Sequence, residues 1–204
     1  MADHREQLVD ELLVMDAQSG RVTAMEMLVS RWQKRLWRYA CRLTGSPEAA
    51  WDVTQESWLG IVRGISRLSD PARFRPWAYR IVTNKANDWL RRRARQSQIQ
   101  ADRDINRQQQ HSDRPQDETA ADIEEILRQL PQRSRTVLTL YYLEGFPLAE
   151  VARVLGTTQG TVKSRLYTAR IEFRQLWESL ADAWQTETPA YEKGEVKWTN
   201  RSSK

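Results

Sequence analysis

The chain has 204 residues, which is enough for one or two small domains that each bury a core. Its formal net charge of +5 favours a polyanionic partner, although most of its charges are expected to be solvated. The lone Cys41 excludes an intramolecular disulfide, and we expect it to serve as a buried small hydrophobe. No apolar run reaches membrane-spanning length, no signal peptide is evident, and His4 and His111 lack ligand-spaced partners. These features favour a cytoplasmic protein without a membrane segment, metal or cofactor.

Three amphipathic helices are predicted in the first third of the chain. Apolar residues at helical spacing place the first at residues 4–18 and the second at residues 25–43, each followed by a glycine. Ser46-Pro47 then provides an N-cap and a proline suited to the first helical position. A third helix is therefore expected to run to about Leu68.

A polar face is predicted on this third helix. Asp52, Gln55 and Glu56 lie within one turn and therefore point to the same side. They are either a solvated acidic patch or a docking site for a partner surface rich in arginine. Spacing alone favours neither interpretation.

After a polar loop at residues 66–73, the sequence predicts a basic helix at residues 74–95. One of its sides is apolar, and the opposite side is lined by polar residues at intervals of three and four: Arg80, Thr83, Asn84, Asn87, Asp88 and Arg91. The helix ends on Arg91-Arg92-Arg93, more charge than capping requires. Aromatic, amide and arginine side chains together suit single-stranded nucleic acid. The alternative is a core helix with a basic end, and each tryptophan taken alone is better explained as core.

A sharp change in composition predicts a flexible linker at residues 97–122. This stretch is rich in Gln, Asp, Arg and Ser and has hardly any large apolar side chains, so it is not expected to fold alone. Fully extended, at ~3.3–3.6 Å per residue, it reaches roughly 90 Å. Two DNA sites about 25 base pairs apart are separated by a similar distance, at ~3.4 Å per pair.

A helix-turn-helix is predicted in the second half of the chain, after helices that begin near Ile123 and Val137. Apolar residues at helical spacing mark its first helix, with Gly156 in the turn and Thr157-Thr158 as the N-cap of a short second helix. The outward side of that second helix carries Gln159, Lys163, Ser164, Tyr167 and Thr168, flanked by Arg165 and Arg170. These side chains suit base edges and phosphates in a major groove. An ordinary amphipathic hairpin is the alternative, but the turn glycine and the basic flanks favour DNA reading.

These residues resemble the bacterial extracytoplasmic-function (ECF) sigma factors of RNA polymerase, which are members of the sigma-70 family, over about residues 8–180. The likeness to region two rests on Leu43-Thr44-Gly45, Glu48-Ala49-Ala50, Asp52-Val53-Thr54-Gln55-Glu56, Phe74-Arg75-Pro76-Trp77, Asn84, Asp88 and Leu90-Arg91-Arg92-Arg93. The likeness to region four rests on Leu130-Pro131, the turn from Tyr141 to Gly145, Gly160-Thr161-Val162-Lys163-Ser164-Arg165-Leu166 and Ala169-Arg170. Each motif is weak on its own, whereas their order and spacing together are specific.

The resemblance implies an all-α protein with two small helical domains. Region two would occupy residues 1–96 and the region-four helix-turn-helix residues 123–180, joined by the flexible linker and followed by a tail at 181–204. It implies that three residues dock on the clamp helices of core polymerase: Asp52, Gln55 and Glu56. The loop 66–73 and the basic helix would melt and read the −10 element through Arg80, Asn84, Asp88, Arg91 and Arg92. The −35 element would be read by Gln159, Lys163, Ser164, Arg165, Tyr167 and Thr168.

The expected function is therefore that of a sigma factor, which binds core RNA polymerase and directs promoter-specific initiation without catalysing a reaction itself. An anti-sigma factor is an expected further partner. One alternative is a helix-turn-helix regulator that acts without polymerase, but such proteins usually dimerise and no sustained heptad is present. A nuclease or recombinase would need clustered carboxylates for a metal or a positioned nucleophile, and the sequence places no further carboxylate beside Asp52 and Glu56 that would complete a metal site.

Overall fold

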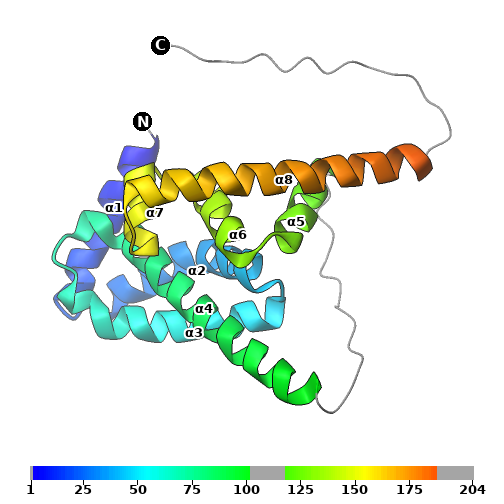
Figure 1. Ribbon diagram of the computed structural model, residues 1–204. Coiled ribbons are helices and arrows are strands. Elements are labelled where there is room, and N and C mark those ends of the chain that lie inside the picture. The colour runs from blue at the N-terminus through cyan, green and yellow to red at the C-terminus, as the bar shows by residue number, and fades with distance from the viewer. Residues whose placement is uncertain (1, 102–117, 188–204) are drawn as a thin grey trace, which may run out of the picture.

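The computed structural model describes residues 2–101 and 118–187, and every regular element in these ranges is helical (Figure 1). The N-terminal half comprises α1 (Ala2–Gln18), α2 (Val22–Thr44), α3 (Pro47–Gly64), the turns η1 (Ile65–Arg67) and η2 (Pro71–Arg73), and α4 (Phe74–Ala101). The C-terminal half comprises α5 (Glu118–Gln129), α6 (Gln132–Leu138), the π-helical turn η3 (Thr139–Leu143), α7 (Leu148–Leu155) and α8 (Gln159–Glu187). The all-α class predicted from the sequence is confirmed.

The signals at the ends of α2 and α3 act as predicted. Gly45 ends α2 at φ 72°, a left-handed conformation in which a side chain is disfavoured. The Ser46 hydroxyl accepts a hydrogen bond from the Ala49 amide at 3.4 Å, and Pro47 opens α3. Helix α3 ends at Gly64, a few residues before the predicted end at Leu68, because the chain there tightens into η1.

The N-terminal half is built around buried aromatic side chains from α2 and α4. Trp32 packs edge-on against Phe74 with 5.8 Å between ring centroids, and Tyr39 lies 4.8 Å from Tyr79. Thr83 is buried beneath them rather than on the polar side of α4, where spacing had placed it. Its hydroxyl lies 2.7 Å from the Tyr39 hydroxyl and donates to the Tyr79 carbonyl at 2.7 Å, so it needs no water.

The turn of the helix-turn-helix forms as predicted, but the length of its second helix differs from the prediction. Gly156 ends α7 at φ 62°, and the Thr158 hydroxyl accepts a hydrogen bond from the Thr161 amide at 3.2 Å. On the opposite side of this second helix, Val162, Leu166 and Ala169 are buried. The second helix was predicted to be short, which is wrong, since α8 has 29 residues. It continues because further apolar side chains in its second half, including Phe173 and Leu176, pack against the core.

The two halves pack against each other into one core. Helix α7 crosses the first half of α4, and α5 and α6 contact α2 (Figure 1). Both ends of the predicted linker 97–122 are helical, since α4 reaches Ala101 and α5 begins at Glu118. Its centre, residues 102–117, and the end of the predicted tail, residues 188–204, lie outside the described part of the chain.

Candidate nucleic-acid interface

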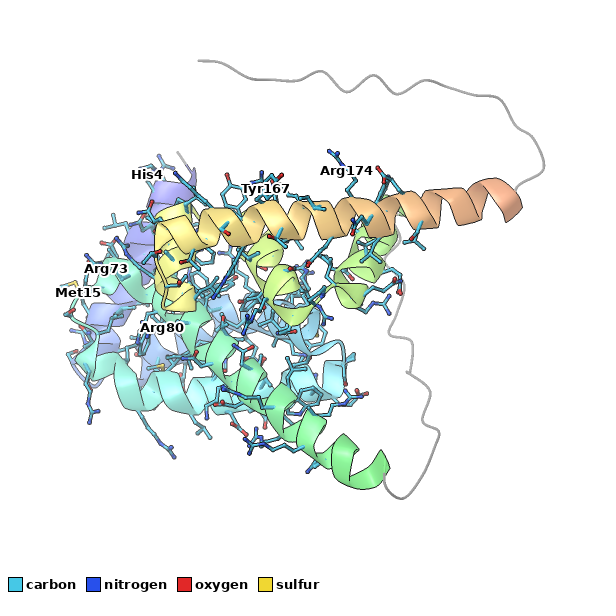
Figure 2. All side chains as sticks on the ribbon, in the orientation of Figure 1. His4, Met15, Arg73, Arg80, Tyr167 and Arg174 are labelled. Atoms are coloured by element: carbon cyan, nitrogen blue, oxygen red, sulfur yellow. The ribbon has the colours of Figure 1, made fainter. Side chains whose placement is uncertain are left out.

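The first candidate surface is the outer side of α8. Gln159, Lys163, Ser164, Tyr167 and Thr168 are all exposed there, and Arg165 is half-buried beside them. Tyr167 has 67% of its surface exposed, and Figure 2 shows it on the side of α8 that faces away from the other helices. Because the buried Val162, Leu166 and Ala169 hold the other side of α8 against the core, these exposed side chains are fixed at the start of a rigid helix. A major groove accepts a helix presented in this way.

The second candidate surface runs along α4. Arg80, Asn84, Asp88, Arg91 and Arg92 are exposed and recur at intervals of three and four, so the structure brings them onto one side of the helix. Arg91 donates to Asp88 at 2.8 Å. The two tryptophans of α4, Trp77 and Trp89, are half-buried and pack against the core. This agrees with the expectation that each tryptophan is part of the core.

The segment before α4 is fixed by specific hydrogen bonds. Gln18 at the end of α1 donates to the carbonyls of Ile65 at 2.9 Å and Leu68 at 2.7 Å. Asp70 accepts from the Ala72 amide at 3.1 Å, which caps η2. The predicted polar loop 66–73 is therefore a pair of tight turns held against α1, positioned next to the start of α4.

The third candidate surface lies on α3, where Asp52 forms no ion pair with the other residues that the structure describes. Asp52 and Gln55 are exposed. Glu56 instead turns toward α4, where it accepts from Lys85 Nζ at 3.1 Å and lies 3.5 Å from Arg92 Nη2. The hydrogen bond from Lys85 lowers the pKa of the Glu56 carboxyl. Glu56 therefore links the α3 surface to the basic end of α4.

Apolar side chains complete the α3 surface, and sequence reasoning singled out neither Leu59 nor Val62 among them. Leu59 and Val62 are 56% and 51% exposed, and they follow Gln55 at helical spacing. Trp51 is 47% exposed although its ring packs against Trp37 at 5.7 Å. A helical projection of α3 with Gln55 at its centre would have found them, because they fall outside the stripe formed by the buried Val53 and Ile61.

Within the residues that the structure describes, no group of His, Cys, Asp and Glu side chains is arranged to hold a metal ion. None of the described helices combines the length and the apolar character needed to cross a membrane. The candidate surfaces consist of hydrogen-bonding side chains, charged groups of both signs and apolar patches. The class that the fold and these surfaces define is that of the helical DNA-binding proteins with a helix-turn-helix.

Comparisons with known proteins identify the family. A family model described as Sigma-70 region 2 matches residues 28–96, and one described as Sigma-70, region 4 matches residues 120–172. The chain is 30% identical over 177 residues to the ECF RNA polymerase sigma-E factor of Haemophilus influenzae, covering 81% of this chain and 93% of that protein. It is also 30% identical over 175 residues to the RNA polymerase sigma-H factor of Pseudomonas aeruginosa, covering 79% and 90% of the two chains.

Solved structures agree with this result. The chain is similar to that in a structure of CnrH in complex with the cytosolic domain of CnrY, with a TM-score of 0.63, 26% identity and coverage of 84% of this chain and 98% of that chain. The sigma factor RpoE from Bartonella quintana, solved with the anti-sigma factor NepR, shares the fold at a TM-score of 0.66 and 21% identity, covering 77% of this chain and 98% of that chain. The chain belongs to the ECF sigma factors of RNA polymerase, within the sigma-70 family.

Proposed function

We propose that this chain binds core RNA polymerase through α3 and directs initiation by reading the −10 element with α4 and the −35 element with α8. The observation that carries the proposal is that three separate helices of one chain each expose a candidate surface of different chemistry. A protein that only read duplex DNA would need the α8 surface alone. The additional surfaces on α3 and α4 supply what initiation requires, namely attachment to the polymerase and capture of an opened strand.

Reading of the −35 element is assigned to Gln159, Lys163, Ser164, Arg165, Tyr167 and Thr168. The exposed Lys163 ammonium is suited to a guanine edge or a phosphate, and the hydroxyls suit either base edges or the backbone. The first turns of α8 supply these groups, so the long remainder of the helix is free to anchor the domain through Phe173.

Melting and reading of the −10 element are assigned to α4 and the turns before it. Arg80, Asn84 and Asp88 form the base-reading part, while Arg91 and Arg92 follow the phosphates of the single strand. Each flipped nucleotide costs a few kcal/mol of stacking, which captured bases and phosphate contacts must offset. Arg91 and Arg92 are already paired with Asp88 and Glu56, so phosphates would have to compete with these carboxylates.

Docking on polymerase is assigned to Asp52, Gln55 and Glu56, with Leu59 and Val62 as the apolar part of the same surface. A carboxylate beside exposed aliphatic side chains fits a partner surface that presents arginines over an apolar centre. The clamp helices of core polymerase are the partner that the family likeness implies.

The organisation follows the family pattern. Residues 1–96 act as region two, 97–122 as the linker and 123–180 as region four, while residues 181–204 have no assigned role. The chain works in the cytoplasm with polymerase, has no catalytic step of its own, and is held inactive by an anti-sigma factor until needed.

The test is transcription in vitro with sigma-free core polymerase, followed by mapping of the start sites. We expect the wild-type chain to confer initiation at a limited set of promoters that share −10 and −35 sequences. Random initiation equal to that of core polymerase alone would refute the proposal. A regulator that acts without polymerase would bind promoter DNA alone yet fail to associate with purified core enzyme in a pull-down.

A further inference from the structure

Helices α3 and α4 approach each other closely along one seam, where α3 presents glycine (Figure 1). A Cβ atom on Gly60 would lie 3.3 Å from Ile81 Cγ2. A Cβ atom on Gly64 would lie 3.0 Å from Trp77 Cζ2. Both distances are shorter than the optimum of about 3.5 to 4.0 Å for two carbon atoms. A side chain at either glycine would push the helices apart, so the glycines set the distance between α3 and α4.

This seam continues into a pair of charged residues. Glu56 lies one turn before Gly60 on the same side of α3. Lys85 lies one turn after Ile81 on the same side of α4. The two residues therefore follow the register set by the glycines, and Lys85 Nζ donates to Glu56 Oε2 at 3.1 Å. Because packing fixes the distance between the helices, Lys85 and Glu56 face each other at a fixed place.

A second cation of α4 reaches the same carboxylate. Arg92 Nη2 lies 3.5 Å from Glu56 Oε1, so each carboxylate oxygen faces one cation. Lys85 and Arg92 are about 10 Å apart along the helix axis, at ~1.5 Å per residue, yet their charged ends converge on one anion. A phosphodiester also presents two anionic oxygens, and lysine and arginine are the side chains that commonly bind it.

The converging cations are open to solvent. The side chains of Lys85, Glu56 and Arg92 are 37%, 40% and 57% exposed. Exposed ion pairs contribute little to folding, so another anion can replace Glu56 with little loss of stability. The hydrogen bond from Lys85 lowers the pKa of the Glu56 carboxyl, which therefore stays ionised near neutral pH and competes with any such anion.

The place of this site along α4 indicates which anion it meets. Lys85 directly follows Asn84, and Arg92 is already part of the surface assigned to the −10 element. A single strand whose bases meet Asn84 would therefore run along the side of α4 from which both cations reach out. Backbone phosphates are the anions that such a strand carries.

We propose that Lys85 and Arg92 form a binding site for a backbone phosphate of single-stranded DNA, and that Glu56 occupies this site in the free chain as an internal competitor. The inference rests on the proposed function for the identity of the strand, the −10 element, whereas the site itself is a property of the chain. Lys85 is thereby a further strand-contacting residue. The competition lowers the affinity of the basic end of α4 for any strand, so phosphate contacts alone hold nucleic acid only weakly there.

The experiment measures the affinity of the full-length free chain for a short, labelled single-stranded DNA of mixed sequence. Fluorescence anisotropy is recorded at several salt concentrations. The free chain is used because Glu56 also belongs to the proposed docking surface, and a change in polymerase affinity would obscure the result. We expect Lys85→Met to weaken binding several-fold and to reduce the slope of log K against log salt by about one, as the loss of one phosphate contact requires. Unchanged affinity and slope would overturn the phosphate site.

Glu56→Gln tests the competitor. Removing the carboxylate charge should raise the affinity for the same DNA several-fold. In the double variant Glu56→Gln/Lys85→Met most of this gain should be lost, because one of the two cations that would take up the phosphate is missing. If the double variant kept the whole gain, Glu56 would act only through its contribution to net charge, and the internal competition would be overturned.

Two matched substitutions serve as controls. Glu6→Gln removes the same charge from an exposed pair, in which Arg35 lies 3.1 Å from Glu6. Lys34→Met removes an exposed cation from α2. Both should bind within about twofold of the wild type, as distant surface positions do. A gain from Glu6→Gln equal to that from Glu56→Gln would overturn the competition.

Circular dichroism verifies the helix content of every variant, and Lys85→Gln replaces Lys85→Met if the latter loses helix. Absence of binding by both the wild type and Glu56→Gln would overturn the site. Failure of the wild-type chain to select start sites would overturn the proposed function and leave these affinities unaffected.

Discussion

Lys163 lies on the exposed side of α8, one turn after Gln159 and one turn before Tyr167. Replacing Lys163 with alanine removes a cation without disturbing the buried Val162 and Leu166 on the opposite side. We expect the affinity of the holoenzyme for a promoter duplex to fall by about 1 to 3 kcal/mol if the ammonium contacts a base edge. The affinity for core polymerase should not change. Fluorescence anisotropy with labelled promoter and with labelled core enzyme measures the two affinities separately.

Arg174→Ala is the matched control for that substitution. Arg174 is an exposed cation on the same helix, about three turns further along, and Figure 2 shows it away from the crossing of α4 and α7. Its loss should change promoter affinity by a few tenths of a kcal/mol, the range expected for a distant surface position. Equal weakening of DNA and polymerase binding by Lys163→Ala would contradict the assigned role.

Cys41 is half-buried on α2, which partly matches the expectation of a buried small hydrophobe. Burial raises the pKa of its thiol to about 11, so very little thiolate exists near neutral pH. We therefore predict that the native chain reacts with a thiol reagent at pH 8 roughly a hundredfold more slowly than the urea-unfolded chain, whose thiol titrates near 8.5. The absorbance of released thionitrobenzoate follows both reactions. Equal rates would mean that this part of α2 is open to solvent.

Single residues show where spacing is an insufficient guide. Thr83 and Asn84 occupy adjacent positions in the polar pattern of α4, yet Thr83 is buried and Asn84 is exposed. A threonine hydroxyl can bond to the carbonyl one turn earlier, so Thr83 enters the core without an unmet donor, whereas the larger amide of Asn84 has no such route. Glu56 was correctly placed on the polar face of α3, but its pairing with Lys85 depends on how α3 packs on α4.

At the scale of the element, the turn between α7 and α8 gives a paired prediction. Gly156 has φ 62°, where an added Cβ is strained whatever space surrounds it, so Gly156→Ala should lower the free energy of unfolding by about 1 to 2 kcal/mol. Gly160 lies inside α8 and a Cβ there meets nothing closer than the Thr158 hydroxyl at 3.8 Å. Gly160→Ala should leave stability unchanged or raise it by up to about 1 kcal/mol. Urea unfolding followed by circular dichroism measures the free energy of unfolding of both variants. If Gly160→Ala were the less stable of the two, Gly156 would not be acting as the left-handed cap of α7.

Element ends were predictable from the sequence wherever a local chemical signal marked them. Gly45, Ser46-Pro47 and Gly156 act on backbone groups within four residues, so the sequence alone contains the information. The length of α8 was not predictable in this way. No stop signal follows Phe173, and the helix continues because its second half finds apolar partners on α5 and in the core, which is a tertiary effect.

At the scale of the whole molecule, the family and the all-α class followed from the order of motifs, but the packing of the two halves against each other did not. Glu144 was noted only as part of a turn, since nothing local indicates that a carboxylate will meet Arg42 and Tyr79, which lie 102 and 65 residues earlier. Leu59 and Val62 differ in this respect, because a helical projection of α3 centred on Gln55 places them beside the polar face without knowledge of the packing. Local sequence signals therefore predict α4 and the helix-turn-helix, whereas long-range contacts determine how these elements pack against each other.

Assembly with polymerase provides the prediction at this scale. Asp52 is exposed beside Gln55 on the proposed docking surface, and the Asp52→Arg substitution reverses its charge without touching the core. We expect stable association with core polymerase to be lost, because like charges would face each other at the interface and such contacts cost several kcal/mol. Glu26→Arg, an equal charge change on the exposed side of α2, should bind as the wild type does. Co-elution of each variant with core enzyme in size-exclusion chromatography makes the measurement, with thermal melting to verify the fold. If Asp52→Arg binds core polymerase as tightly as the wild type does, the polymerase contact lies elsewhere on the molecule. If Asp52→Arg loses this affinity while Glu26→Arg keeps it, holoenzyme formation depends on the exposed side of α3.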